Sequence, residues 1–222
     1  MVDAASWLPT ELTPMSHSLD VLFDVALGVV TFFFVLVEVL LVTFLIRYRR
    51  TKTNQTGVNV HGNNRLEVIW TLIPAAILVC MGVYCVKVVY ALQTPPAKPE
   101  VIKVTGHMWF WEFQYPNGLT TKNDLRVPAG ENVLFEIHSA DVIHGFYIPA
   151  VRIQQDALPG RQTEFWMNAD TDKVGQVFDV PCDQFCGSGH PIMDAKMTVM
   201  SPADYEHWEQ TQLQKQKQNS GQ

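Results

Sequence analysis

Residues 180–193, VPCDQFCGSGHPIM, bring four soft metal-binding side chains into one short segment. They are the thiols of Cys182 and Cys186, the imidazole of His190 and the thioether of Met193. Soft sulfur and imidazole ligands favour copper, with zinc as the second choice, because methionine is a poor zinc ligand. The segment therefore predicts a soft-metal site.

The number of cysteines bears on the number of metal ions. A mononuclear blue-copper site uses one cysteine, two histidines and a weakly bound methionine, so two cysteines oversupply thiolate for a single ion. Two thiolates that bridge two copper ions would use every ligand, provided that a second histidine comes from elsewhere. His144, in SADVIHGFYIPA, is the obvious supplier, because cupredoxin-like sandwiches take one ligand from an upstream strand. Gly187 and Gly189 let the loop fold tightly.

A disulfide between Cys182 and Cys186 is the simpler alternative, since such bonds form in oxidising compartments. It would leave His144, His190 and Met193 without a role. We favour the metal site for that reason.

Two long apolar segments precede these motifs. Residues 21–46 read VLFDVALGVVTFFFVLVEVLLVTFLI and residues 66–92 read LEVIWTLIPAAILVCMGVYCVKVVYAL. Each is longer than the roughly 20 residues that cross a bilayer. Neither resembles a cleaved signal peptide, because the first lacks a basic flank and both exceed a signal's apolar core. We predict a two-helix transmembrane hairpin over residues 21–92.

The distribution of basic residues predicts the orientation of this hairpin. The connecting loop, residues 47–65, is rich in Lys and Arg, whereas residues 1–20 contain neither. The positive-inside rule places such a loop in the cytoplasm. We therefore expect a two-pass protein of the cell (inner) membrane, with residues 1–20 and the whole chain after residue 92 on the periplasmic side.

The outer part of the chain has the pattern of an all-β domain. Residues 93–100, QTPPAKPE, form a proline-rich linker. Residues 101–200 hold about seven short β-like runs separated by turns such as YPNG and LPGR, namely residues 101–106, 108–115, 132–139, 145–151, 163–168, 176–180 and 195–200. This spacing favours a Greek-key sandwich. Ser201 precedes a proline and acidic residues, which predicts a capped helix in residues 201–222. The expected fold is a membrane α-helical hairpin plus an all-β cupredoxin-like Greek-key sandwich.

The outer part is also acidic. From Gln93 onward, 10 Lys and Arg stand against 16 Asp and Glu, a net charge of −6. An acidic surface steers basic partners towards it, and it also serves solubility alone. The net charge does not distinguish the attraction of basic partners from solubility alone.

In combination and in order, several motifs resemble subunit II of the haem–copper oxidases, the cytochrome c oxidase superfamily: LEVIWTLIP, GHMWFWEFQY, DVIHGFYIP, DALPGR and CDQFCGSGHPIM. The resemblance covers nearly the whole chain and implies a binuclear, mixed-valence CuA centre of two copper ions. By this resemblance two cysteines bridge both ions, two histidines hold one ion each, and a methionine and a backbone carbonyl are weak ligands. The implied residues are Cys182, Cys186, His144, His190, Met193 and Gln184, the last through its carbonyl oxygen.

Two positions depart from the mitochondrial-like members of this family. Those members have Glu at the Gln184 position, and its side chain reaches a magnesium ion, so magnesium is not predicted here. The loop is similar to that of B-type oxidases, although two helices are more usual in the A type. Gln114 occupies a position that is often Glu, which weakens one part of the acidic docking face.

The resemblance implies further roles outside the ligand set. The first Trp of the aromatic segment, Trp109, would accept the electron from cytochrome c; burial in the sandwich core is the alternative. Glu67, at the start of the second apolar segment, would lie at the mouth of a proton-uptake path, since ionisable residues at such depth are usually functional. Its alternative is a snorkelling helix end. Asp141 and Phe185 would tune the redox potential without binding metal.

The implied function is electron acceptance by subunit II of a respiratory terminal oxidase. Electrons from a periplasmic donor such as cytochrome c would pass to haem in subunit I, where oxygen is reduced to water and protons are pumped. This subunit would hold no catalytic residue, contact other oxidase subunits and lipid, and bind no nucleic acid. The alternatives are the same subunit in a CuA-containing nitric oxide reductase and a membrane-anchored copper carrier.

Overall fold

The computed structural model of the chain describes residues 7–52, 57, 59 and 61–220. The chain divides into two compact units, one formed by Met1–Leu19 with Val89–Gln222 and the other by Asp20–Val88. The predicted N-terminal segment 1–20, loop 47–65 and tail 201–222 each lie partly outside the described residues.

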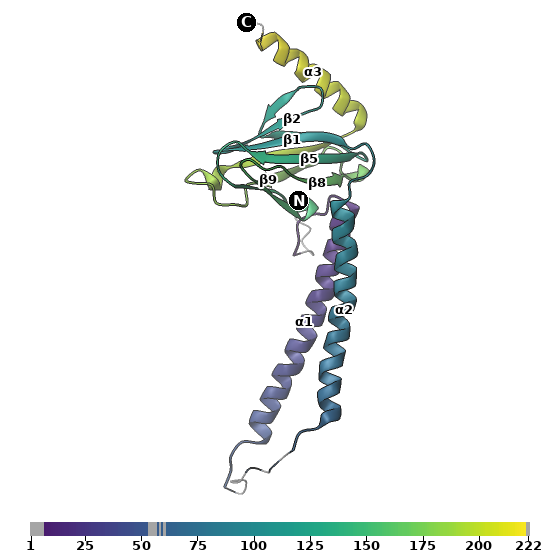
Figure 1. The fold of residues 1–222 in the computed structure, drawn as a ribbon, viewed down its shortest axis with the longest axis vertical. Helices are drawn as coiled ribbons and strands as arrows, with labels where there is room; N and C mark the ends of the chain where they lie inside the picture. Colours follow the sequence, from purple (N-terminus) through teal and green to yellow (C-terminus); the bar gives the residue numbers. More distant parts are fainter. Residues whose placement is uncertain (1–6, 53–56, 58, 60, 221–222) are drawn as a thin grey trace. The chain divides into compact units, whose positions relative to one another are not determined.

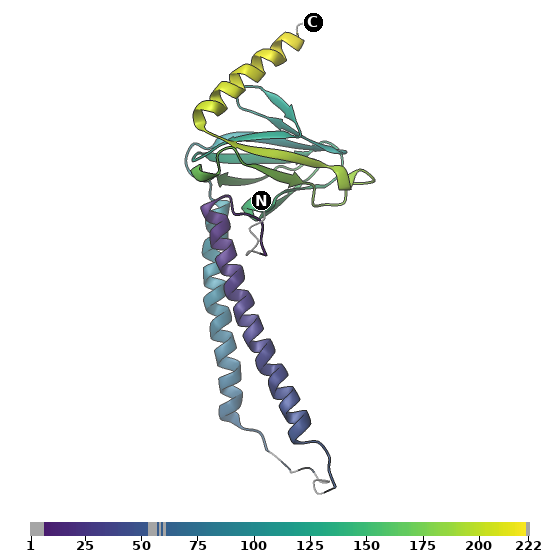
Figure 2. The same cartoon turned by 180° about the vertical axis from the view of Figure 1, so that it is seen from behind.

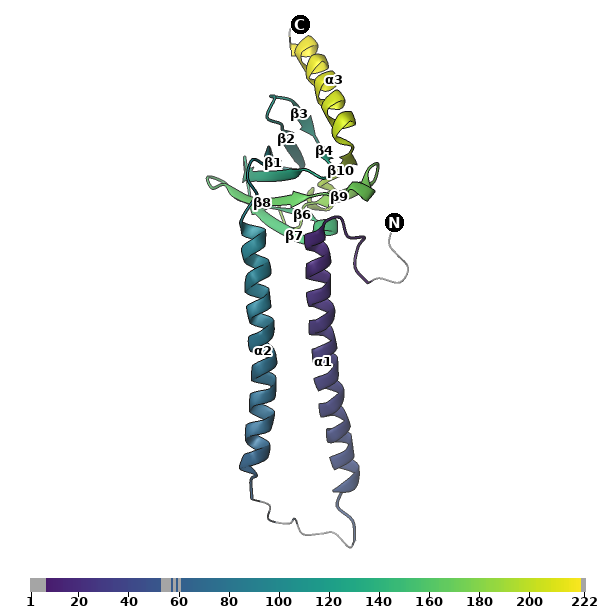
Figure 3. The ribbon, with the colours of Figure 1, turned by 90° about the vertical axis from the view of Figure 1, so that its right-hand side faces the viewer.

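Two long helices carry the apolar segments. Helix α1 is Pro14–Arg47 and α2 is Asn64–Gln93, and the two run in opposite directions (Figure 3). At about 1.5 Å per residue, each exceeds the roughly 30 Å hydrocarbon thickness of a bilayer. Asn63 caps α2, because its Oδ1 accepts hydrogen bonds from the amides of Arg65 (3.1 Å) and Leu66 (3.3 Å). By length and composition both helices could cross a membrane.

Ten strands form the outer domain (Figure 1). One sheet has the order β3-β2-β1-β5-β8, a second β4-β10-β9, and a two-stranded ribbon joins β6 to β7. The bounds are β1 Glu100–His107, β2 Phe110–Gln114, β3 Thr120–Lys122, β4 Asp124–Pro128, β5 Asn132–Ser139, β6 His144–Ile148, β7 Ile153–Ala157, β8 Thr163–Asn168, β9 Val177–Pro181 and β10 Asp194–Met200. Short 3-10 helices are η1 Pro149–Val151, η2 Thr171–Lys173 and η3 His190–Ile192.

The strand pairing is that of a Greek-key sandwich. Strand β1 pairs antiparallel with β2 but parallel with β5, and β10 pairs antiparallel with β9 but parallel with β4. Parallel neighbours so far apart in sequence require long crossing connections between the sheets. The predicted membrane hairpin with an all-β sandwich is confirmed in its architecture.

Alternating burial along the strands builds the core between the sheets. In β5, for example, Val133, Phe135 and Ile137 are buried and the residues between them are more exposed. Phe146 of β6 lies at the centre, with its ring 5.2 to 6.2 Å from four aromatic rings, those of Trp111, Phe113, Phe135 and Phe165. Each such pair adds about 0.5–1.5 kcal/mol beyond the area it buries. This rigid aromatic core supports the strand that carries His144.

The strands differ from the sequence prediction in three places. The run expected at 108–115 begins at Phe110, because Met108 and Trp109 lie in the turn after β1. The run expected at 145–151 ends at Ile148, because Pro149 opens η1 and has no amide hydrogen for a ladder. Strands β3, β4 and β7 were not predicted.

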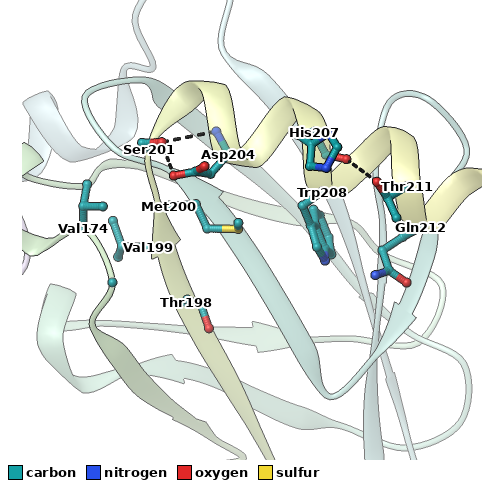
Figure 4. Close-up of a pocket in the computed structure, with 11 residues that line it drawn as sticks. Val174, Thr198, Val199, Met200, Ser201, Asp204, His207, Trp208, Thr211 and Gln212 are labelled. Atoms are coloured by element: carbon teal, nitrogen blue, oxygen red, sulfur yellow. Dashed lines mark hydrogen bonds between the residues drawn. The ribbon is translucent and has the colours of Figure 1, made fainter.

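Helix α3, Pro202–Ser220, follows the last strand, as the Ser201 signal predicts (Figure 2). The Ser201 hydroxyl accepts a hydrogen bond from the Asp204 amide (3.2 Å). The Trp208 ring packs edge-on against Tyr115 at 5.3 Å between centroids. Trp208 and Met200 line an open groove between α3 and β10 (Figure 4).

On another side of α3, glutamates gather near the start of β1. The Tyr205 hydroxyl donates to Glu100 Oε1 at 2.6 Å. Among the described residues none lies within hydrogen-bonding reach of the buried Oε1 of Glu209. Burial, and then the nearby Glu100 and Glu206 carboxylates, raise the pKa of Glu209 to about 7.

Replacing Glu209 with glutamine is expected to stabilise the outer domain at neutral pH. The folded state holds this proton more tightly than the unfolded chain, whose pKa is 4.5, so stability falls as the pH rises from 4.5 to about 7. Glutamine removes that loss. Because Glu209 is partly exposed, we expect a gain on the order of 1 kcal/mol at pH 8.

Urea unfolding of both proteins at pH 5 and pH 8 measures this effect. Glu164→Gln, a change at an exposed glutamate of β8, is the matched control. The gain in the free energy of unfolding should be larger at pH 8 than at pH 5. An equal gain at both pH values would show that folding does not raise the pKa of Glu209.

Candidate metal centre

The predicted ligands come together at one end of the sandwich. His144 is the first residue of β6, and the other five candidates lie in the connection between β9 and β10. This connection closes on itself through a hydrogen bond from the Cys182 amide to the Met193 carbonyl (2.9 Å). It also pairs with β6, where the Asp183 amide donates to the Gly145 carbonyl (2.9 Å). Two segments about 40 residues apart in sequence are thereby held together.

Two thiol groups form the middle of the cluster. The sulfur atoms of Cys182 and Cys186 lie 3.8 Å apart. Nδ1 of His144 is 3.9 Å from the Cys182 sulfur, and Nδ1 of His190 is 3.8 Å from the Cys186 sulfur. Each sulfur therefore faces the other sulfur and one ring nitrogen.

Each sulfur also has one weaker candidate ligand beside it. The Gln184 carbonyl oxygen is 3.2 Å from the Cys182 sulfur, and the Met193 sulfur is 3.8 Å from the Cys186 sulfur. The six groups thus form two similar halves around the sulfur pair.

The cysteines are free thiols, not a disulfide. Both are buried, and burial followed by the adjacent Cys182 raises the pKa of Cys186 to about 11. Thiolates this close together need a cation between them, and metal binding is what removes such protons. The donor set and its burial therefore fit soft metal ions, and copper is the metal that suits thiolate, imidazole and thioether together.

Asp141 fixes the orientation of His144. Its Oδ1 lies 2.8 Å from His144 Nε2, which leaves Nδ1 of that ring facing the thiols. Partial burial would raise the pKa of Asp141, but hydrogen bonds from His144 and from the Met108 and Val142 amides outweigh this and hold the pKa below its usual range. Carboxylates that accept from a ligand histidine orient it and increase its basicity.

Replacing Asp141 with alanine is therefore expected to weaken copper retention about 10- to 100-fold. The copper left on the purified protein after competition with a chelator measures the effect. Asp183→Ala, which removes an exposed carboxylate of the metal loop, should leave retention unchanged. Equal retention in the Asp141 and Asp183 variants would rule out the orienting role.

Gly106 of β1 makes room for the His144 ring. A Cβ at this position would lie 2.7 Å from His144 Cδ2, closer than side chains tolerate. Trp111, fully buried in β2, packs edge-on against the same ring at 5.8 Å. The alternative given to Trp109, a place in the core, thus describes Trp111 instead.

Trp109 lies at the surface of the metal loop. Trp109 is 38% exposed, and its Nε1 donates a hydrogen bond to the Cys186 carbonyl at 3.1 Å. Phe185 is 76% exposed and packs edge-on against His190 at 5.9 Å. Both aromatic residues thus touch the cluster from its outer side.

Glu67 belongs to the other compact unit, where it lies in the first turn of α2. An acidic residue in a first turn also interacts favourably with the helix dipole. Sequence reasoning did not detect the bonds that join Met108 to Asp141 and Trp109 to Cys186. These contacts link loops far apart in sequence, and no local signal marks them.

A cupredoxin-like sandwich that follows two membrane-type helices and gathers two thiols with two imidazoles defines the class of membrane-anchored copper proteins. Comparison with known proteins narrows this class. Residues 3–88 match the family described as cytochrome C oxidase subunit II, transmembrane domain, and residues 117–200 match cytochrome C oxidase subunit II, periplasmic domain. The chain belongs to the cytochrome c oxidase subunit II family.

Individual relatives agree. Cytochrome c oxidase subunit 2 of Alkalihalophilus pseudofirmus is 34% identical over 210 residues, which are 90% of this chain and 60% of the relative. The protein of the same name from Thermostichus vulcanus is 29% identical, over 90% of this chain and 77% of the relative. The chain thus spans less than two thirds of the first of these relatives.

A solved structure supports the fold. The periplasmic domain of subunit II of cytochrome oxidase (CoxB) of Bradyrhizobium japonicum is 27% identical, with a TM-score of 0.52 over 55% of this chain and 99% of that one. The predicted family and fold are confirmed. The chain is a membrane protein with an extracellular domain, and its family implies copper binding at the His144, Cys182 and Cys186 cluster.

Proposed function

We propose that this chain is the electron-accepting subunit of a respiratory terminal oxidase. It takes single electrons from a periplasmic donor such as cytochrome c and passes them to haem in subunit I, for reduction of oxygen to water coupled to proton pumping. The observation that carries the proposal is the pair of buried thiols, each facing one imidazole.

The six groups of the cluster are proposed to hold two copper ions. Cys182 and Cys186 would be shared by both ions, His144 and His190 would hold one each through Nδ1, and Met193 and the Gln184 carbonyl would be weak ligands. When bound, such a pair stores one electron shared between two metal ions. The sandwich holds the ligands rigidly, so little rearranges on electron transfer and the activation barrier is low.

Exposed apolar residues border this centre and suit contact with other proteins. Met108, Ile143, Phe185 and Ile192 are each exposed, and each is adjacent in sequence to a candidate ligand or to Trp109. Apolar patches rimmed by polar residues mark protein interfaces. The net charge of −6 on residues 93–222 supports a basic donor such as cytochrome c.

Two residues and one loop outside the metal centre also have proposed roles. Trp109 is the residue that receives the electron, because it is partly exposed and hydrogen-bonded to a ligand residue. Glu67 is proposed at the start of a proton path into subunit I, since the family resemblance supports that role. The basic loop 47–65 supports a cytoplasmic hairpin connection, with both termini on the periplasmic side.

Turnover of the purified complex tests the proposed activity. Reduced cytochrome c should drive oxygen consumption, with one electron taken from each donor molecule. Turnover of nitric oxide in place of oxygen would favour the nitric oxide reductase alternative, which the Gln184 loop leaves open. A chain that releases exchangeable copper and supports no turnover would instead be a membrane-anchored copper carrier.

A further inference from the structure

The indole of Trp109 rests on two glycines of the metal loop. The ideal Cβ position of Gly187 lies 3.3 Å from Trp109 Nε1, and that of Gly189 lies 2.2 Å from Trp109 Cδ2 and 2.5 Å from Cγ. The ring therefore covers the backbone of both residues. Only hydrogen atoms separate the indole from the backbone of the loop.

Glycine is needed at positions 187 and 189 for different physical reasons. Gly187 has a φ of +113°, a conformation that side chains rarely adopt, so its own backbone calls for glycine. Gly189 has φ −88° and ψ 3°, which other residues adopt. Nothing in the backbone of Gly189 therefore excludes alanine. What excludes a side chain there is the indole.

The Trp109 indole cannot move away from the loop without losing its hydrogen bond to Cys186. Its Nε1 donates to the Cys186 carbonyl at 3.1 Å. An alanine methyl group at position 189 would have to be at least 3.4 Å from the ring atoms, where the present separation is 2.2 Å. The indole would have to move away from the loop by about 1 Å, which breaks or stretches that hydrogen bond.

We propose that Gly189 is a positioning residue, which sets the contact between the Trp109 indole and the metal loop and thereby the rate at which electrons arrive from the donor. The proposal rests on the proposed function. In the step concerned, one electron leaves the reduced haem iron of a cytochrome c and is taken up by the copper pair. No bond forms or breaks and no proton moves, so the rate depends on distance and coupling along the route through Trp109.

The Gly189→Ala variant of the complete oxidase complex tests this. Rapid mixing with reduced cytochrome c gives the rate of electron arrival, and the paramagnetic spectrum reports the copper pair. Because the electron-transfer rate falls steeply as the separation between the indole and the metal loop grows, we expect electron arrival to slow several-fold with the copper spectrum retained. Ser188→Ala, at the exposed neighbouring position, should be as fast as wild type.

The same Gly189→Ala change made in a Trp109→Ala protein shows whether the slowing depends on the Trp109 indole. In Trp109→Ala there is no indole to collide with, so adding Gly189→Ala should slow the reaction no further. If the single Gly189 variant loses its copper spectrum, the double variant should recover it. A Gly189→Ala complex as fast as wild type, an equal slowing in both backgrounds, or a copper spectrum lost in both would overturn the inference.

The wild-type complex separates this inference from the function on which it rests. A wild type that lacks the two-copper spectrum or takes no electrons from cytochrome c refutes the proposed function and the inference together. A wild type with both properties, beside an unaffected Gly189→Ala variant, refutes the inference alone.

Discussion

Replacing Cys186 with serine is expected to abolish the two-copper centre. The Cys186 sulfur lies within 3.8 Å of the Cys182 sulfur, of His190 Nδ1 and of the Met193 sulfur, so it serves both halves of the cluster. A hydroxyl group is a harder and weaker ligand for copper than a thiolate. We expect at most one copper ion per chain, no spectrum of a shared electron, and no electron transfer from the donor.

The chain offers a matched control for this variant. Cys80 and Cys85 lie in α2 and belong to the other compact unit. Serine at either position should leave the copper spectrum unchanged. A Cys186→Ser protein that keeps the wild-type spectrum would refute the bridging role.

Replacing Trp109 with alanine is expected to slow electron arrival strongly, by much more than Gly189→Ala does, while both copper ions are retained. The indole is the exposed group that is hydrogen-bonded to the Cys186 carbonyl, so its loss removes that route and leaves a longer gap for the electron to cross. Trp109→Phe keeps a ring but loses the N–H donor, and its rate should fall between the two. Rapid mixing with reduced cytochrome c measures all three proteins.

Trp7→Ala, which removes a tryptophan that is 99% exposed, is the control for the loss of an indole as such. It should match wild type. If Trp109→Ala also matched wild type, electrons would reach the copper pair by another route, and the exposed residues Phe185 and Ile192 would be the next candidates to vary.

The grouping of the candidate ligands was predictable because most of these residues follow local rules. Four of the side chains lie within 12 consecutive residues, from Cys182 to Met193, and their chemical softness limits the choice of metal. The hairpin followed from apolar length, and the sandwich from short runs between turns. His144 could be added because cupredoxin-like folds take a ligand from an upstream strand.

Several strands and two residues beside the metal centre could not be predicted, because they depend on contacts between distant parts of the sequence. Strand β7, IQQDA, looks polar and gains its place by pairing with β6, while β4 pairs in parallel with the distant β10. In the sequence, the second glycine of GSGH, Gly189, indicates only a flexible loop. In the structure it contacts the ring of Trp109, 80 residues upstream. Asp141 likewise gains its role only when Met108 and His144 are brought to it.

Copper analysis of the purified chain, combined with its paramagnetic spectrum, tests the central claim most directly. The account predicts two copper ions per chain and one unpaired electron spread over both nuclei. One copper with a localised electron, zinc in place of copper, or a bond between the Cys182 and Cys186 sulfurs in the active protein would contradict it.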